Sequence, residues 1–160
     1  MDGIIVIDGW KAKIRFSAAH VIPEYEKCGR LHGHSYAVHA RLFGSLDEKG
    51  IIIDFSIAKQ ILKDISDTFD HKVIIPNKST VVSTKKDHQS IELQSLGKKY
   101  VFPEIDCVLL PISSSSAEHL AEYVLHQFLE KLGTDHNLTK IEIGIDEGYG
   151  QGAWISKTIK

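Results

Sequence analysis

The stretch HGHSYAVHARLFG, residues 32–44, decides the fold of the first half of the chain. From residue 36 to residue 42, apolar side chains alternate with more polar ones, the period of two that is typical of a half-buried β-strand. Gly44 and the polar turn after it end this strand. A similar alternation runs through residues 12–18, and His20 continues its apolar parity. The two segments predict neighbouring strands, which we expect to pair antiparallel.

Two amphipathic helices are predicted farther along the chain. The first follows Asp54, a good N-cap, and its apolar residues recur at three- and four-residue steps as far as Phe69. The second begins at Ser115-Ser116-Ala117-Glu118, a capping-box pattern, and Gly133 ends it. Each helix therefore has one apolar side that must be buried against another element.

Strand periodicity returns near the C-terminus, at residues 141–145 and, after a glycine-rich turn, at residues 153–159. The order β-β-α-α-β-β predicts an α+β fold, a four-stranded antiparallel sheet with both helices on one face. Residues 76–111, between the helices, are mostly β-prone, and we expect them to form an inserted β-rich flap. A single domain over residues 1–160 that carries this insertion is the expected organisation.

The composition indicates a soluble globular protein and excludes several other classes. Hydrophobic residues make up 42% of the 160 residues and charged residues 25%, with a net charge of -2. The basic residues are too scattered to follow a nucleic-acid backbone, and the apolar runs fall far short of the roughly 20 residues of a membrane span. The N-terminus lacks a signal-peptide pattern, so a cytoplasmic location is expected.

His32-Gly33-His34 is the sharpest local signal in the sequence. Residues two apart on an extended chain point to the same side and can offer two imidazoles to one ion. His20, at the end of the neighbouring strand, supplies a third. Three histidines leave zinc an open fourth position, as in catalytic sites, so we expect one Zn²⁺ per chain. An accidental surface turn is the alternative, and the proximity of His20 and Cys28 argues against it.

Further candidate groups flank these histidines. Cys28 lies in a polar, partly basic loop where an exposed thiolate suits a base or nucleophile, although it could instead be a fourth zinc ligand. Asp70-His71 follows the first helix, whose dipole favours a protonated imidazole, so the pair is a candidate proton donor. The alternative is a capping histidine beside an incidental aspartate.

Glu147 continues the apolar parity of residues 141–145. A buried carboxylate needs a partner, and two parallel N–H donors, such as the guanidine-like edge of a pterin ring, would provide one. An ordinary acid at a strand end is the alternative.

Together these motifs resemble the 6-pyruvoyl-tetrahydropterin synthase superfamily, and within it the 6-carboxy-tetrahydropterin synthases. The resemblance covers most of the chain, in the family's order, through the segments 16–20, 28–34, 53–55, 70–71, 115–118 and Glu147. Three residues separate Cys28 from His32, which resembles the carboxy synthases; the animal pyruvoyl synthases look longer there. A branch that makes a hydroxymethyl pterin carries glutamate in place of this cysteine.

The resemblance implies a tunnelling fold, usually assembled as a homo-hexamer of two stacked trimers with active sites between subunits. It implies that His20, His32 and His34 hold zinc, that Cys28, Asp70 and His71 transfer protons, and that Glu147 and Ser116 bind a pterin triphosphate substrate. The chain departs from the family pattern in its longer insertion, in the serines at 115 and 116 where threonines are common, and in Gly148 where threonine often follows the glutamate.

The implied reaction is a zinc-dependent lyase reaction that converts 7,8-dihydroneopterin triphosphate to 6-carboxy-5,6,7,8-tetrahydropterin, acetaldehyde and triphosphate. It would serve 7-deazapurine (queuosine or archaeosine) biosynthesis. One alternative is a 6-pyruvoyl-tetrahydropterin synthase, which eliminates triphosphate without carbon–carbon cleavage. Another is a non-catalytic zinc- or pterin-binding module, although binding alone would need neither Cys28 nor Asp70-His71.

Overall fold

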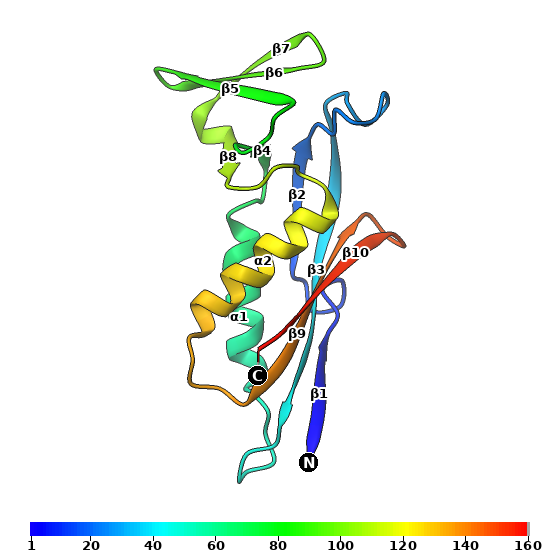
Figure 1. The fold of residues 1–160 in the computed structure, drawn as a ribbon, viewed down its shortest axis with the longest axis vertical. Coiled ribbons are helices and arrows are strands. Elements are labelled where there is room, and N and C mark those ends of the chain that lie inside the picture. The colour runs from blue at the N-terminus through cyan, green and yellow to red at the C-terminus, as the bar shows by residue number, and fades with distance from the viewer. Residues whose placement is uncertain (160) are drawn as a thin grey trace.

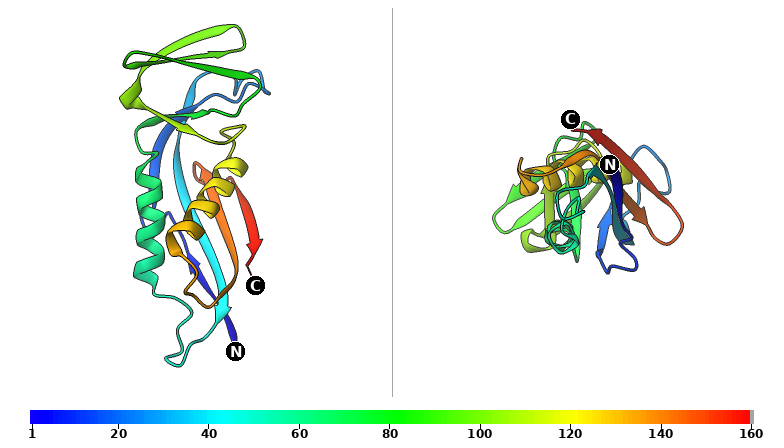
Figure 2. Two further views of the ribbon diagram at one scale, coloured as in Figure 1. Left: turned by 60° about the vertical axis from the view of Figure 1, so that its left-hand side comes forward. Right: turned by 90° about the horizontal axis from the view of Figure 1, so that it is seen from below.

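Two layers make up the body of the protein, a twisted sheet and a pair of helices on one of its faces (Figures 1 and 2). The computed structural model describes residues 1–159, and within them seven strands join into the main sheet in the order β10-β9-β3-β2-β4-β8, with β1 paired to β3. The strands are β1 (Asp2–Ile7), β2 (Arg15–His20), β3 (His32–Ser45), β4 (Lys72–Pro76), β8 (Cys107–Leu110), β9 (Leu138–Glu147) and β10 (Gly152–Thr158).

The 14-residue strand β3 organises the sheet, because β1, β2 and β9 all pair with it antiparallel. Its register with β2 sets His20 opposite His32, and its register with β9 sets Tyr36 opposite Glu147. The expected antiparallel pair of strands is therefore confirmed. Three strands deliver the candidate residues to one end of the sheet.

Helices α1 (Phe55–Asp67) and α2 (Ala117–Leu132) form as the sequence predicts. The Asp54 carboxylate accepts a hydrogen bond from the Ser56 N–H and caps α1, while α2 ends at Gly133, which has a φ of 76°. Helix α1 packs against β2, and α2 packs against β9 and β10. Fully buried side chains from both helices, such as Leu62 and Phe128, fill the space above the sheet.

The N-terminus of α2 differs from the predicted capping box. Ser116, not Ser115, is the N-cap, and its hydroxyl accepts a hydrogen bond from the His119 N–H. Glu118 is therefore the second residue of the helix, one position too early to reach back to the cap. The buried Ser115 is left outside the helix with its carbonyl free to bind another group.

The expectation of four antiparallel strands is wrong, because β1, β4 and β8 extend the main sheet. Strand β4 pairs with β2, and β8 with β4, both in parallel. Residues 73–75 and 108–110 are short continuous apolar runs, as parallel strands tend to be, so an alternating pattern does not detect them. The first strand also starts later than expected, since residues 12–14 lie before β2, which begins at Arg15.

The insertion between the helices is β-rich, as expected, but only its middle forms a separate unit. Strands β5 (Val82–Asp87), β6 (Ser90–Ser95) and β7 (Lys98–Pro103) make an antiparallel sheet, here called the inserted sheet. Its apolar side chains cluster with Val21 and Ile75 of the body. It lies at one end of the molecule, beside the loop between β2 and β3 (Figures 1 and 2).

Neither helix in the part of the chain that the structure describes is long and apolar enough to cross a membrane.

Candidate metal centre and its pocket

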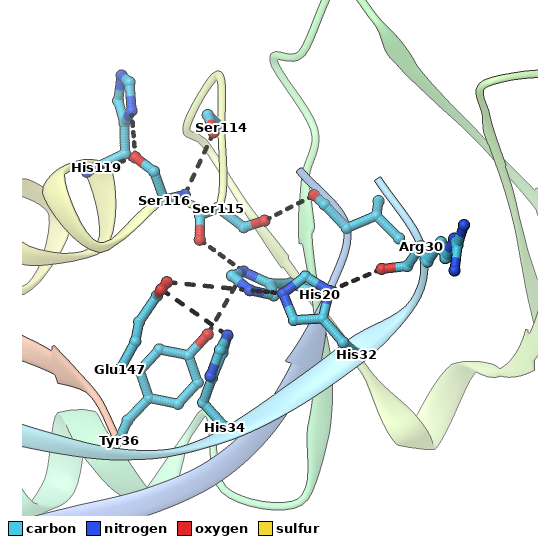
Figure 3. A network of polar contacts seen from close by, with 11 residues as sticks. His20, Arg30, His32, His34, Tyr36, Ser114, Ser115, Ser116, His119 and Glu147 are labelled. Atoms are coloured by element: carbon cyan, nitrogen blue, oxygen red, sulfur yellow. Dashed lines mark hydrogen bonds and ion pairs between the residues drawn. The ribbon is translucent and has the colours of Figure 1, made fainter. Parts of the chain in front are cut away.

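His20, His32 and His34 converge where β2 ends and β3 begins (Figure 3). Each offers one ring nitrogen, and these three atoms lie within 4.8 Å of one another. The Nε2 atoms of His20 and His32 are 3.1 Å apart. The antiparallel register and the two-residue spacing of an extended strand thus bring together the three side chains that the sequence singled out.

Main-chain carbonyls fix the orientation of two of these rings. His20 Nδ1 lies 2.9 Å from the Ser115 carbonyl oxygen, and His32 Nδ1 lies 2.7 Å from the Arg30 carbonyl oxygen. A carbonyl can only accept, so each Nδ1 carries a proton and each neutral ring presents a lone pair at Nε2. Two lone pairs facing each other at 3.1 Å repel, and a cation bound to both relieves this repulsion.

His34 completes the arrangement. Its Nε2 is buried and makes no hydrogen bond. Three imidazoles, two of them held by carbonyls through the opposite nitrogen, form a donor set that suits first-row metal ions and leaves a coordination position open. The residues present therefore fit a metal ion.

Burial lowers the pKa of two of these rings, those of His20 and His34. Desolvation lowers the pKa of His20 to about 4, with the neighbouring His32 and His34 adding to the effect against the hydrogen bond to Ser115. Desolvation also lowers the pKa of His34. His20 is consequently neutral at neutral pH, and binding a cation there requires no proton release from it.

A pocket of about 900 Å³ opens beside the three histidines. Cys28, Ser116 and Glu147 line it, so the structure brings these predicted site residues to the same place as the histidines. Cys28 is exposed on the loop between β2 and β3. The pocket wall also includes the charged side chains of Lys27, Arg30 and Glu118.

Asp70 and His71 do not line this pocket. They lie just after α1, and His71 lines a different hollow together with Ser17 and Ser35. The His71 side chain is 84% exposed, and its Nδ1 lies 2.9 Å from Asp70 Oδ2. The Ser17 N–H donates to Asp70 Oδ1 and is the main cause of the lowered pKa of this carboxyl. The pair is therefore preformed in a hollow that shares His34 with the pocket of Cys28 but does not include Cys28 itself.

Glu147 faces the histidines from β9 (Figure 3). Its carboxylate oxygens are 3.9 Å from His20 Nε2 and 3.8 Å from His34 Nε2. Desolvation raises the pKa of Glu147 against the opposing effect of His32. Ligand atoms of a tetrahedral zinc site lie about 3.3 Å apart. Glu147 is thus close enough to join a metal after a small shift, or to pair with the N–H groups of a bound molecule.

Two groups of this site were not predicted from the sequence. The Ser115 carbonyl that holds His20 is a main-chain atom and leaves no mark on the sequence. Glu118 was assigned to a capping box, whereas it lines the pocket. Its pairing with Ser115 at the S-x-x-E spacing favoured that assignment, and no other signal in the sequence opposed it.

Comparisons with known proteins agree with this geometry. The model of the 6-pyruvoyl tetrahydropterin synthase family matches residues 10–157. A Methanocaldococcus jannaschii protein, whose name gives the provisional assignment 6-carboxy-5,6,7,8-tetrahydropterin synthase, is 36% identical over 98% of each chain. The Rickettsia conorii 6-carboxy-5,6,7,8-tetrahydropterin synthase is 29% identical, covering 78% of this chain and 83% of its own. The solved structure of Plasmodium falciparum 6-pyruvoyl tetrahydropterin synthase covers 99% of both chains, with 31% identity and a TM-score of 0.90.

His32 and His34 are expected to bind the metal ion directly. His32→Ala and His34→Ala should each lose the metal, because each removes one of three imidazole donors. The exposed His126 of α2 provides the control, His126→Ala, which should keep it. Elemental analysis of the purified, dialysed proteins measures the ratio of metal to chain, expected near one for the wild type and the control. Full retention of metal in both ligand variants would contradict the assignment.

Proposed function

The chain belongs to the 6-pyruvoyl tetrahydropterin synthase family, and we propose that it is a zinc-dependent 6-carboxy-tetrahydropterin synthase. The reaction takes 7,8-dihydroneopterin triphosphate and water to 6-carboxy-5,6,7,8-tetrahydropterin, acetaldehyde and triphosphate. As a lyase of this kind it would act in the cytoplasm, in 7-deazapurine biosynthesis.

One observation supports the proposal most strongly. The imidazoles of His20, His32 and His34 line a pocket whose wall also includes a thiol and a carboxylate, and main-chain carbonyls orient two of these rings. Zinc bound by His20, His32 and His34 would supply a Lewis acid that acidifies the carbon-bound protons next to the substrate's side-chain hydroxyls. The chain's own residues then have to hold the ring and move the protons.

Cys28 is the group proposed to remove a carbon-bound proton from the substrate side chain. Its thiol is exposed and on the pocket wall, where a bound substrate can reach it. Lys27 and Arg30 lie on the same wall, and their charges suit the triphosphate of the substrate. Cys107, by contrast, lies outside this pocket, and desolvation raises the pKa of its thiol, which leaves less of it in the reactive thiolate form.

Glu147 and Ser116 are proposed to bind the pterin ring. A carboxylate held in a partly desolvated wall can accept two parallel N–H bonds from the guanidine-like edge of the ring. The Ser116 hydroxyl lines the same pocket and can add a further hydrogen bond. Binding of the ring by these two residues would orient the side chain of the substrate toward the histidines.

Asp70 and His71 are proposed to relay protons in a pocket of another copy of the chain. The imidazole is 84% exposed and already oriented by the Asp70 carboxylate, which fits a group that acts on a neighbour. A homo-hexamer of two stacked trimers, with active sites between subunits, would bring such a pair to Cys28 of the next chain. The exposed edges of the main sheet, β8 and β10, are the natural places for copies to join.

A second candidate reaction is that of a 6-pyruvoyl-tetrahydropterin synthase, the name carried by the P. falciparum structure. It shares the elimination of triphosphate but omits the cleavage that releases acetaldehyde. A non-catalytic zinc- or pterin-binding module is the candidate of another class, and the exposed thiol on the pocket wall argues against it.

A product assay separates the three candidates. The metal-loaded protein is incubated with 7,8-dihydroneopterin triphosphate, and acetaldehyde is measured with alcohol dehydrogenase and NADH while triphosphate is quantified in parallel. We expect acetaldehyde and triphosphate in equal amounts. Triphosphate without acetaldehyde would favour the pyruvoyl synthase, and neither product, despite bound pterin, would favour the binding module.

Cys28→Ala should keep the metal and the fold but lose turnover by about 10²- to 10⁴-fold, the usual contribution of a general base. The control Cys107→Ala changes a thiol outside the pocket and should stay near wild-type activity. Steady-state kinetics and metal analysis on both variants provide the test. Loss of metal from Cys28→Ala would instead identify the thiol as a ligand.

Glu147→Gln distinguishes the two roles open to that carboxylate. If Glu147 binds the ring, the amide should weaken pterin binding roughly 10- to 150-fold, since a hydrogen bond to a charged group contributes about 1.5 to 3 kcal/mol. Metal content should not change. Titration with a pterin product and metal analysis give the two readings, with the exposed Glu48→Gln as control. Metal loss with unchanged pterin affinity would make Glu147 a ligand.

A further inference from the structure

The inserted sheet touches the segment that carries Cys28. Residues 21–31, here called the cysteine loop, connect β2 to β3 and lie at the same end of the molecule as the inserted sheet (Figure 1). The loop supplies one wall of the pocket, and the inserted sheet itself supplies none of the lining residues. The sheet therefore has no direct contact with the pocket, and the loop connects the two.

The first anchor of the cysteine loop is Val21, directly after His20. Val21 is 2% exposed and packs in one apolar cluster with Val82, Ile91 and Leu93 of the inserted sheet. The Ser115 hydroxyl also donates a hydrogen bond to the Val21 carbonyl. The beginning of the loop is thus fixed to the inserted sheet by buried contacts.

The second anchor is Leu96, at the turn between β6 and β7. A Cβ placed on the buried Gly29 would lie 2.5 Å from Leu96 Cδ1 and 2.8 Å from the Tyr25 carbonyl oxygen. The leucine side chain therefore packs directly on the glycine that follows Cys28. Only glycine leaves room for this contact.

Hydrogen bonds inside the loop connect the two anchored positions to Cys28. The Ile22 N–H donates to the Cys28 carbonyl at 2.8 Å, and the Gly29 N–H donates to the Tyr25 carbonyl at 2.6 Å. Both bonds act on the peptide group that joins Cys28 to Gly29. This group is consequently linked to Val21 through the neighbouring Ile22, and it lies next to the contact between Gly29 and Leu96.

The backbone conformation of Leu96 is unfavourable for a leucine. Leu96 and Gly97 have φ values of 51° and 71°. A turn with two positive φ values strongly prefers Asn-Gly, and leucine in the left-handed region is strained. A leucine that is 54% exposed gains little from its own burial, so the turn tolerates an unfavourable residue that packs on Gly29.

We propose that Leu96 is a positioning residue for Cys28, and that the inserted sheet serves to hold the cysteine loop with its thiol on the pocket wall. The proposal rests on the proposed function for the role of Cys28. The contact itself can be tested without turnover.

The test is Leu96→Asn, which suits the turn and removes the apolar contact. Val101→Asn, at another exposed apolar position of the inserted sheet, is the matched control, and Leu96→Met restores a flexible apolar side chain. Hydrogen–deuterium exchange of the cysteine loop, followed by mass spectrometry, is measured on the metal-loaded proteins together with metal content, thermal stability, kcat and KM.

Leu96→Asn should speed exchange of the loop amides roughly fourfold, the effect expected from losing about one buried methylene group. Metal content and thermal stability should stay at wild-type values, kcat should fall with little change in KM, and Leu96→Met should recover both exchange and kcat. Val101→Asn should match the wild type throughout. If the loop amides of Leu96→Asn exchange as slowly as those of Val101→Asn, the proposal is wrong. An inactive wild type would refute the proposed function, and the exchange rates would then still test the contact between Leu96 and the cysteine loop.

Discussion

The site depends on the hydrogen bonds that two main-chain carbonyls accept from histidine rings. The Ser115 and Arg30 carbonyls bind Nδ1 of His20 and His32, which forces the lone pairs of both Nε2 atoms into the same small volume, 3.1 Å apart. Without a bound cation this arrangement is unfavourable, and the surrounding fold has to maintain it. The buried Ser115, at the start of α2, therefore links the helix layer directly to the metal centre.

The sheet register supplies the rest of the geometry. Strand β3 holds His32 and His34 on one side, and its pairing with β2 and β9 brings His20 and Glu147 to them. The apolar faces of α1 and α2 keep this sheet rigid from one side. The cysteine loop is supported by the inserted sheet at two points, at its own Val21 and at Gly29, on which Leu96 packs. The loop that carries the exposed Cys28 is thus held by an element far from it in sequence.

Sequence patterns predicted the parts of the molecule that depend on local periodicity. The period of two placed His20, His32 and His34 on one side of adjacent strands, and the three- and four-residue steps identified both helices. Strands β4 and β8 were missed because they are short, uniformly apolar and paired in parallel across the insertion. The predicted capping box at Ser115 was wrong because either of two consecutive serines can be the N-cap. The Ser115 carbonyl binds His20 Nδ1, and Ser116 is the N-cap of α2. The separation of Asp70-His71 from Cys28 depends on tertiary packing, which no local pattern encodes.

X-ray absorption spectroscopy at the zinc edge of the zinc-loaded protein measures ligand type and distance at the bound ion, and so tests whether the three histidines hold it. Three nitrogen ligands are expected at about 2.0 to 2.1 Å, with the remaining position filled by a light atom. Histidine-specific multiple scattering should identify the nitrogens as imidazole. A sulfur ligand at about 2.3 Å, or fewer than three imidazoles, would contradict a centre built on His20, His32 and His34.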